Sequence, residues 1–425
     1  MIQIQQIMGG NRFIKFYIIL FLPLFSIGQS ANSTTGNQQT LNTIITAVPF
    51  LTINNDIVSL GKGGLGTATS SFYQGAGFAG NPALLATGRK NIYGQFTYLP
   101  WLRALVPDIN YSSGNFAFAF HKRHTIGVEF VYFSMGPITF TDNTGNNIGQ
   151  YKPNEFATTL NYAVSLGRTF KLGLGLRYIN SNLTGGYFNG GTGSVGRAFS
   201  TNWGFLYRDT VQLYSTGKLQ WGIGLCLQDI GTKISYSSTK IQKDFLPQNL
   251  RIGCGITFRQ KAGNNSYFAF DLGYEVNKLL VPTPPVYATN ANGQILEDAN
   301  GNKIIAKGKN PNVNSLAALF TSFADAPYGS KEEWAEVNHI VGFETRHVLN
   351  NRVYWALRTG YFYESKWKGG RQYTTIGGGF GLWGAGINLF YLIPNTSQRS
   401  PLENTLGFQL SYSINLGKGT GFFKD

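Results

Sequence analysis

From Asn91 to the C-terminus, the chain consists of segments of about ten residues in which apolar side chains alternate with glycine or polar ones. Residues 172–178 read LGLGLRY, and residues 406–412 read LGFQLSY. Because consecutive side chains of a strand point to opposite faces, each segment has one apolar face and one small or polar face. An apolar outer face with a small, polar inner face is typical of the wall of a transmembrane β-barrel.

Fourteen segments with this alternation are predicted to be strands. Their approximate ranges are 91–99, 112–120, 125–134, 155–165, 171–181, 198–207, 219–229, 248–258, 267–276, 337–346, 353–363, 373–381, 383–391 and 404–414. Short and longer connections alternate between them, so the short turns should face the periplasm and the longer loops the cell exterior. The predicted fold is therefore all-β, a single fourteen-stranded antiparallel transmembrane β-barrel with long extracellular loops.

The longest predicted loop, 277–336, contains three prolines near its start and two Asn-Gly pairs that favour turns. Residues 315–323 and 331–336 are predicted to form short helices within it. A loop of this length usually has a function beyond connecting two strands.

The first residues have the features of an export signal. Arg12 and Lys15 precede the apolar run 16–25, and Ser26 and Gly28 follow as small residues at a cleavage site. This order predicts a cleaved secretory signal peptide over residues 1–28. A membrane anchor is the alternative, but the apolar run is shorter than the ~20 residues that cross a bilayer.

The remaining chain divides into a short N-terminal region and the barrel. Residues 29–46 are rich in Ser, Thr, Asn and Gln, which predicts a flexible segment. Residues 47–90 are too irregular for barrel strands and are expected to plug or line the lumen from the periplasmic side. The barrel is expected to span 91–416, followed by a periplasmic tail over 417–425.

The composition agrees with a barrel, but it does not explain why the chain carries a net positive charge. The chain contains 54 Gly, 15% aromatic and only 13% charged residues, as expected for glycine in the lumen and aromatic residues at the membrane interfaces. The net charge is +15, and removal of Arg12 and Lys15 leaves +13. Attraction to lipopolysaccharide phosphates or solvated loops would explain this charge. Nucleic acid is not an expected partner, because no basic helix or RNA-binding motif is present.

Several charged side chains share the inner face of the predicted strands. Side chains alternate between the two faces of a strand, so the position of a residue in this alternation, its strand parity, predicts which way it points. Strand parity points eight charged side chains into the lumen: Glu129, Arg177, Arg251, Asp271, Glu275, Glu344, Arg346 and Arg358. They could form a selectivity or substrate path, or they could pair and rigidify the barrel. The mixture of opposite signs favours pairing.

The sequence offers little support for an enzyme or a disulfide. Cys226 falls on the inward parity and Cys254 on the outward parity, which predicts two free, buried cysteines. A lipid acylhydrolase would need a nucleophile, a histidine and a carboxylate in reach of lipid. Three of the four histidines fall at predicted periplasmic turns, and no GxSxG motif lies near any of them. No catalytic residue, cofactor or metal site is therefore expected.

Several strings spread along the mature chain resemble one family. The strings are AVPFL at 47–51, NPA at 81–83, YLPWL at 98–102, LVPDIN at 105–110, KPNEFA at 152–157, FLP at 245–247 and PLENTL at 401–406. In their order they resemble the PorV/PorQ family, outer-membrane barrels of the type IX secretion system of Bacteroidota. The resemblance implies a fourteen-stranded barrel of the FadL fatty-acid-transporter type, with no established catalytic residues.

The resemblance also implies a role and a set of partners. PorV-like proteins associate with a giant outer-membrane translocon barrel and receive folded cargo through its C-terminal signal domain. They then deliver that cargo to the surface attachment complex that contains a PorU-like sortase. Lipopolysaccharide and outer-membrane lipid are the expected surroundings. The alternative function is a FadL-like transporter of hydrophobic small molecules.

A secretion role would place the binding residues at the outer rim. Apolar residues of the 100–111 loop would form an exposed ridge for a protein partner. The ridge and its neighbours are Trp101, Leu102, Leu105, Val106, Pro107 and Asp108. The alternative is that this loop folds inward and caps the lumen. The 277–336 loop is a second candidate, as a docking element for the translocon.

Overall fold

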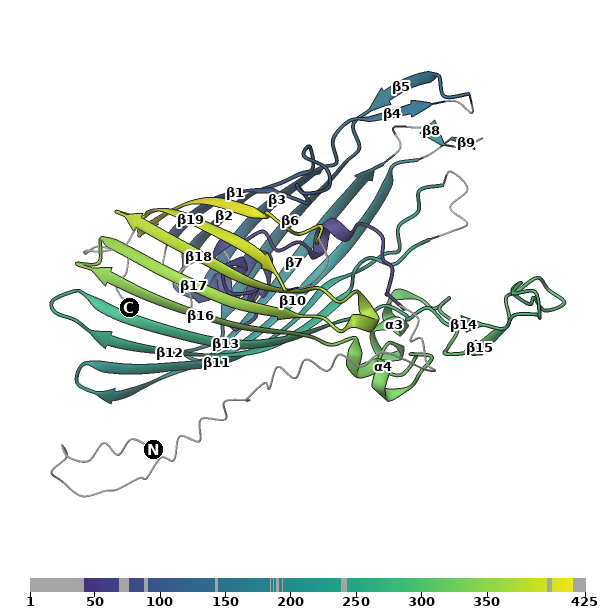
Figure 1. Ribbon diagram of the computed structural model, residues 1–425. Helices are drawn as coiled ribbons and strands as arrows, with labels where there is room; N and C mark the ends of the chain where they lie inside the picture. The colour runs from purple at the N-terminus through teal and green to yellow at the C-terminus, as the bar shows by residue number, and fades with distance from the viewer. Residues whose placement is uncertain are drawn as a thin grey trace. The chain divides into compact units, whose positions relative to one another are not determined.

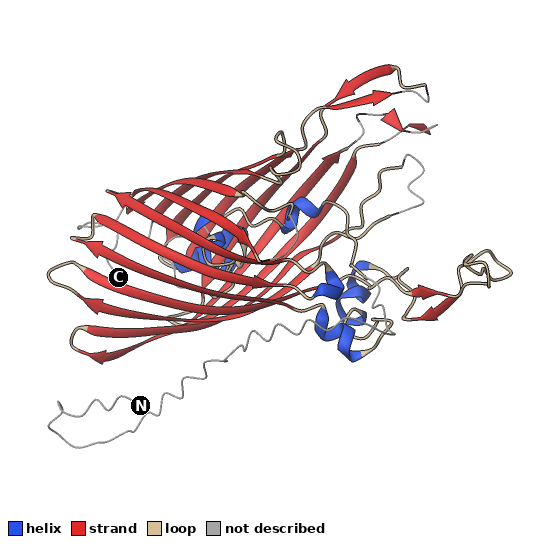
Figure 2. Cartoon of the chain, viewed as in Figure 1, coloured by secondary structure: helices blue, strands red, loops and turns tan. Residues whose placement is uncertain are grey.

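The computed structural model describes residues 42–415 apart from 69–75, 88–90, 142–143, 184, 186, 189–190, 193, 238–242 and 396–399. The predicted signal peptide, most of the predicted flexible segment and the predicted tail lie outside these residues. In the described part, fourteen antiparallel strands form a closed barrel, as predicted (Figures 1 and 2).

In barrel order the strands are β1 (Asn91–Pro100), β2 (Asn110–His121), β3 (His124–Ser134), β6 (Asn154–Ser165), β7 (Phe170–Asn182), β10 (Gly196–Tyr214), β11 (Gly217–Gly231), β12 (Asn249–Lys261), β13 (Tyr267–Leu279), β16 (Asn338–Leu349), β17 (Val353–Tyr363), β18 (Gln372–Leu382), β19 (Ala385–Pro394) and β20 (Leu406–Asn415). The barrel closes where β20 pairs with β1. Closure removes the exposed edges that an open sheet would present to lipid.

The predicted alternation holds along the wall. In β17, Leu357 on the outer face is 58% exposed, whereas its neighbour Arg358 on the inner face is 4% exposed. The outer face thus presents apolar side chains to lipid, and the inner face carries polar ones. One prediction was too short: β10 and β11 continue past Asp209 to a turn at Tyr214–Gly217, because the alternation persists through polar residues.

Positive φ angles shape two of the tight turns. The β18–β19 connection is a two-residue hairpin, in which Trp383 and Gly384 both have positive φ; Gly384 fits this turn, whereas Trp383 is unusual there. The β16–β17 connection has three residues, 350–352, and Asn350 and Asn351 supply its positive φ angles. All the tight turns lie at one end of the barrel, and the long loops lie at the other.

The long loops carry small elements of their own. They contain the hairpins β4–β5 (Ile138–Thr141, Asn147–Tyr151), β8–β9 (Tyr187–Phe188, Gly191–Thr192) and β14–β15 (Val286–Tyr287, Ile305–Lys307), and the helices α3 (Ser315–Thr321), α4 (Ser330–Ala335) and η3 (Lys366–Lys368). The two helices predicted in the 277–336 loop are therefore confirmed. Asn314 begins α3, because its side chain accepts a hydrogen bond from the Ala317 amide. No helix in the described ranges is long and apolar enough to cross a membrane.

An irregular N-terminal segment lies inside the barrel (Figure 2). It contains η1 (Pro49–Thr52), α1 (Ile57–Leu60), α2 (Ala76–Ala79) and η2 (Pro82–Thr87). We call the described residues 42–68 and 76–87 the plug. Its first part lies among the long loops, where the Ala47 amide donates to the Phe245 carbonyl over 2.9 Å. Its last part reaches β6 and β7. The expectation of a plug on the periplasmic side therefore fits only the end of the segment.

Glycines on the inner face let the plug backbone approach the wall. A Cβ atom at Gly224 of β11 would collide with the Thr67 carbonyl oxygen, and one at Gly360 of β17 would collide with the Lys62 carbonyl carbon. Only glycine leaves room for this backbone-to-backbone packing. The plug is thus fitted to the wall at positions that the sequence marks only as small residues.

Replacement of Gly360 by alanine should therefore displace the plug. We expect a loss of about 1–3 kcal/mol in stability, the usual cost of overpacking a filled interior. Thermal unfolding in detergent, followed by the heat-dependent shift in gel mobility, would measure it. The matched control is Gly378→Ala, since a Cβ there would meet nothing within 4 Å. Equal effects of the two substitutions would contradict close plug-to-wall packing.

Candidate functional site: a plugged lumen beneath an outer cavity

The lumen contains a buried cluster of ions centred on Arg177 of β7. Its guanidinium donates to Glu129 of β3 over 3.0 Å and to Asp229 of β11 over 2.8 Å. Thr159 accepts from the Arg177 Nε over 2.9 Å. All three charges are at least nine-tenths buried. Because unpaired buried charges are very costly, this cluster keeps its members together.

Asp229 was missed by strand parity, and a bulge explains the error. Inward parity along β11 runs through Gly224, Cys226 and Gln228, so Asp229 was expected to face lipid. Asp229 instead has a positive φ of 54°, and the pairing of β10 with β11 shifts register between Thr201 and Trp203. A bulge inserts an extra residue and turns the next side chain to the other face. No feature of the sequence marked this position.

A second cluster fastens the plug to the wall. Arg251 of β12 donates its Nε to Glu275 of β13 over 2.6 Å. Glu275 accepts from the amides of Gly66 and Thr67 over 2.9 Å each, and Arg251 donates to the Gly64 carbonyl over 2.8 Å. The charged pair therefore satisfies backbone groups of residues 64–67, which belong to no helix or strand.

The third cluster runs across the wall from β13 to β17. Arg346 donates to Asp271 and lies 3.2 Å from Glu344, which in turn accepts from Arg358 over 2.6 Å. The structure thus places all eight predicted lumen charges on the inner face and brings them together in three clusters. They bind one another and the plug.

Polar plug residues complete this interior, and sequence reasoning did not identify them. Asn55 donates to Glu129. Gln409 of β20 donates to Asp56 over 3.0 Å. The Gly63 amide donates to the Thr375 hydroxyl of β18 over 2.9 Å. The plug is therefore bonded to strands on several sides of the barrel.

Above the plug, at the long-loop end, lies a cavity of about 480 Å³. Its lining mixes charged, polar and apolar groups. Among the lining residues are Trp101, Asp229, Arg251, Ile340, Phe362, Glu364, Lys368, Arg371 and Tyr373. A volume of this order is typical of ligand-sized pockets. The lining therefore offers both apolar contacts and hydrogen-bonding groups to a ligand.

The first described residues form a strap along this cavity. The Asn42 amide donates to the Trp367 carbonyl over 3.1 Å, and five residues later the Ala47 amide donates to Phe245. Between these two anchors, Ile45 is 80% exposed, while Thr43 and Ile44 line the cavity. The strap therefore presents an apolar side chain to the outside.

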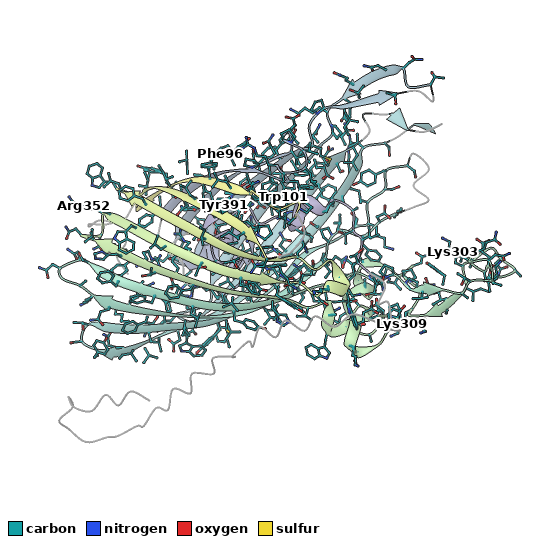
Figure 3. The ribbon with its side chains drawn as sticks, in the orientation of Figure 1. Phe96, Trp101, Lys303, Lys309, Arg352 and Tyr391 are labelled. Atoms are coloured by element: carbon teal, nitrogen blue, oxygen red, sulfur yellow. The ribbon has the colours of Figure 1, made fainter. Side chains whose placement is uncertain are left out.

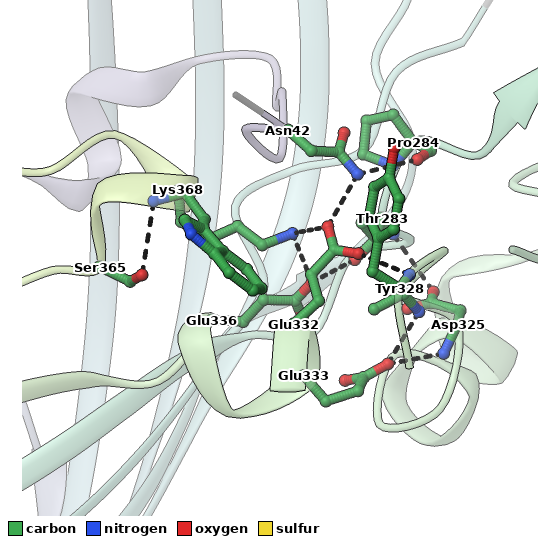
Figure 4. A network of polar contacts seen from close by, with 12 residues as sticks. Asn42, Thr283, Pro284, Asp325, Tyr328, Glu332, Glu333, Glu336, Ser365 and Lys368 are labelled. Carbon is green, nitrogen blue, oxygen red and sulfur yellow. Dashed lines mark hydrogen bonds and ion pairs between the residues drawn. The ribbon is translucent and has the colours of Figure 1, made fainter. Parts of the chain in front are cut away.

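A network of ions fixes the long loop to its neighbours, as Figure 4 shows. Lys368 of η3 donates to Glu332 over 2.6 Å and lies 2.9 Å from Glu336. Asn42 donates to Glu332 over 2.8 Å, and Thr283 donates to Glu336 over 2.6 Å. We call this set the loop lock. It joins the strap, the 277–336 loop and the β17–β18 loop into one unit.

Asp325 lies beside the loop lock. Its Oδ2 accepts from the Thr283 amide over 3.2 Å. Burial, with added repulsion from Glu333 and Glu336, raises the pKa of Asp325 to about 6. The three carboxylates lie close enough to share a cation. Lys278 supplies positive charge here, since its ammonium lies 3.3 Å from Glu333 and binds Glu336.

The predicted ridge of the 100–111 loop is divided in the structure. Leu105 is 63% and Val106 39% exposed, and Pro107 and Asp108 are also exposed. Trp101 is half-buried and packs against the apolar cluster around Phe50, and Leu102 is half-buried too. One part of the loop thus faces outward, while Trp101 turns inward and helps to line the cavity.

The cysteines and histidines occupy structural positions. Cys226 is buried and Cys254 is exposed, and both are free thiols. The prediction of two buried cysteines is therefore wrong for Cys254, because its outward parity faces lipid. His124 and His339 make hydrogen bonds of 2.7 Å to tyrosine hydroxyls.

Comparisons with known proteins matched one protein family and several solved barrel structures. A family model described as type IX secretion system protein PorV matches residues 35–286, more than half of the chain. A search of curated protein sequences returned no significant match.

Among solved structures, the chain is similar to the CymD monoaromatic hydrocarbon channel, with 12% identity over 85% of this chain and 96% of that one, and a TM-score of 0.39. It is also similar to a Pseudomonas aeruginosa FadL homologue, with 10% identity over 85% and 98%, and a TM-score of 0.38. Neither likeness supports an argument about function.

Replacement of Arg177, the positive charge at the centre of the first cluster, should destabilise the barrel strongly. Arg177→Met would leave Glu129 and Asp229 buried without their partner, and we expect a loss of about 3–5 kcal/mol. Thermal unfolding in detergent would measure it. Arg197→Met, at an exposed position of β10, is the matched control and should change stability by less than about 0.5 kcal/mol. If both variants unfold alike, the cluster does not stabilise the interior.

The raised pKa of Asp325 predicts a pH dependence with a definite sign. Between its ordinary value of about 4 and its folded value of about 6, the folded state binds the proton more tightly. Stability should therefore fall as pH rises through this window. Asp325→Asn should be more stable than the wild type at about pH 7.5, and this advantage should vanish near pH 4. Thermal midpoints at both pH values would test this, with exposed Glu297→Gln as control. An equal advantage at both pH values would refute it.

Proposed function

Because this chain belongs to the PorV family of type IX secretion system proteins, we propose that it binds secreted cargo at the outer mouth of its barrel. The cargo would carry a C-terminal signal domain and would arrive from a giant translocon barrel. The chain would then deliver it to a surface attachment complex that contains a PorU-like sortase. The barrel lies in the outer membrane, after export by the signal peptide proposed at residues 1–28.

The observation that carries this proposal is the occupied lumen. The plug is bonded to Glu129, Glu275, Thr375 and Gln409 on different parts of the wall. A barrel whose interior is held in this way acts through its rims more readily than through its pore. Binding at the outer mouth uses the part of the lumen that the plug leaves empty.

The loop lock supports the same proposal. It holds the 277–336 loop against the barrel mouth, so that apolar side chains remain at the surface. Phe320 of α3 is 79% and Trp334 of α4 is 75% exposed. Exposed aromatic residues on a rigid base are typical of protein-binding surfaces. We assign this surface and the Leu105–Val106 ridge to contacts with the translocon and with cargo.

The alternative, a FadL-like transporter of hydrophobic small molecules, has weaker support. Such a transporter needs an apolar binding pocket with a path through the wall or the lumen. The outer cavity combines apolar residues such as Ile340 and Phe362 with charged groups, including Arg251, Lys368 and Arg371. Contact with lipopolysaccharide would fall to exposed loop cations such as Lys303 and Lys309 (Figure 3).

Co-purification would test the proposal. The tagged chain would be extracted gently from its native outer membrane, and bound molecules would be identified by mass spectrometry. We expect a very large barrel protein and secreted proteins that share a C-terminal domain. Leu105→Ser with Val106→Ser should reduce their recovery severalfold, because the exposed ridge would be lost.

The matched control is Val211→Ser with Leu213→Ser, which are similarly exposed but lie in the β10–β11 hairpin at the opposite end. If both variants recover as much of the partner proteins as the wild type does, the Leu105–Val106 ridge does not bind them. Recovery of the barrel with acyl chains alone would favour the transporter.

A further inference from the structure

One wall of the outer cavity carries a row of carboxamide side chains. They lie on β11, β12, β13 and β16, which are consecutive strands of the barrel. Gln228 pairs with Asn249 across the β11–β12 ladder, and Asn277 pairs with Asn338 across the β13–β16 ladder. Asn277 also pairs with Arg251, one inward position from Asn249 on β12. All four carboxamides line the cavity, and we call them the carboxamide row.

The carboxamide row keeps hydrogen-bonding groups that the protein itself does not use. Asn338 donates to the Asn277 side-chain oxygen over 3.0 Å, and Gln228 donates to the Gly80 carbonyl over 3.1 Å. Within the described part of the chain, the row makes no other side-chain hydrogen bond. The four side chains are half-buried. Since each carboxamide has two donors and one acceptor oxygen, both kinds of group remain for a ligand.

The charged groups of the same cavity, by contrast, are already paired. The pairs are Arg251 with Glu275, Asp229 with Arg177, Lys368 with Glu332 and Glu336, and Arg371 with Glu364. The polar groups that remain in the wall are therefore neutral. They match a ligand without net charge whose groups both donate and accept hydrogen bonds, and hydroxyls have this property.

Aromatic rings border the carboxamide row. Phe362 of β17 and Tyr373 of β18 continue the cavity wall beyond β16, and their stacked rings lie 4.8 Å apart. Trp101 lines the cavity as well, and it follows β1, which lies opposite β12 in the closed order of the barrel. Tyr373 and Trp101 are half-buried. Such rings offer apolar faces to the C–H face of a sugar ring, while polar neighbours bind its hydroxyls.

We propose that the carboxamide row and these rings form a binding site for an uncharged saccharide. Neighbouring strands lie about 4.8 Å apart, so the row offers polar groups at close, regular intervals, as the hydroxyls around sugar rings do. An extended peptide is the competing ligand, but its backbone groups on one side recur only every two residues, about 6.8 Å. The saccharide therefore fits the row better.

The proposed site goes beyond the proposed function. Cargo and translocon contacts are assigned to the Leu105–Val106 ridge and to the exposed side chains of α3 and α4, whereas the carboxamide row lies inside the cavity. Two sources can supply the ligand at the cell surface: the saccharide chains of lipopolysaccharide, and free oligosaccharides. Their shared chemistry is a chain of neutral, hydroxyl-rich rings.

Titration calorimetry would test the proposal on the full chain, in a detergent without a sugar head group. The saccharide probes are maltohexaose, cellohexaose and the polysaccharide released from native lipopolysaccharide by mild acid. The reference is a neutral Gly-Ser peptide of similar length. We expect saturable binding of a saccharide, little changed by added salt because the ligand is uncharged, and no binding of the peptide. Binding of the released polysaccharide alone would identify lipopolysaccharide as the source, and binding of a hexasaccharide would identify free oligosaccharides.

Paired variants would locate the site. Asn277→Ala with Asn338→Ala should weaken saccharide binding about tenfold, because two side chains that bind hydroxyls are lost. Asn292→Ala with Asn312→Ala removes two exposed carboxamides from the long loop and should leave binding unchanged. Gln228→Ala is a second test on another strand and should weaken binding about threefold. Gel mobility before and after heating would confirm that each variant is folded.

Three results would overturn the proposal: no binding of any saccharide probe, equal effects of the two double variants, or binding of the peptide in place of the saccharides. The last result would assign the cavity to an extended polypeptide. Co-purification of cargo enters none of these measurements, so failure of the saccharide site and failure of the proposed function are distinguishable.

Discussion

The structure depends on burying charged side chains inside a barrel whose lumen is occupied by the plug. An isolated ion in such an interior would cost several kcal/mol, so each must meet an opposite charge or a backbone group. Arg177 meets two carboxylates from two other strands, and Glu275 meets Arg251 and two plug amides. The same requirement holds the plug, because several of its backbone donors and acceptors are satisfied by the wall. Wall and plug therefore stabilise each other.

A filled interior leaves the two ends of the barrel to act separately. At the outer end, the loop lock brings together residues that are far apart in the chain and supports exposed aromatic side chains above a cavity. At the inner end, the described turns and strand ends carry more basic than acidic residues.

Strand parity was a good guide to the candidate site where the strands are regular, and it failed where they are not. All eight lumen charges chosen by parity lie on the inner face, because a period of two is enforced by lipid on one side and the plug on the other. Strand parity assigned Asp229 to the wrong face because of a bulge, which a pattern of apolar and polar residues does not reveal. Trp101 and Leu105 belong to one predicted ridge, yet of the two only Leu105 is exposed, since Trp101 packs against the apolar cluster around Phe50.

By itself the sequence determined the number of strands, their faces, the alternation of short turns with long loops, the two loop helices and the family resemblance. These features follow from local periodicity and from turn-forming residues, which act over a few positions. Only the tertiary structure decided the path of the plug, the outer cavity and the loop lock. Each depends on contacts between distant segments, such as Asn42 with Glu332 and Asp56 with Gln409. Such contacts are set by barrel closure, which brings β20 beside β1 and leaves no trace in any local pattern.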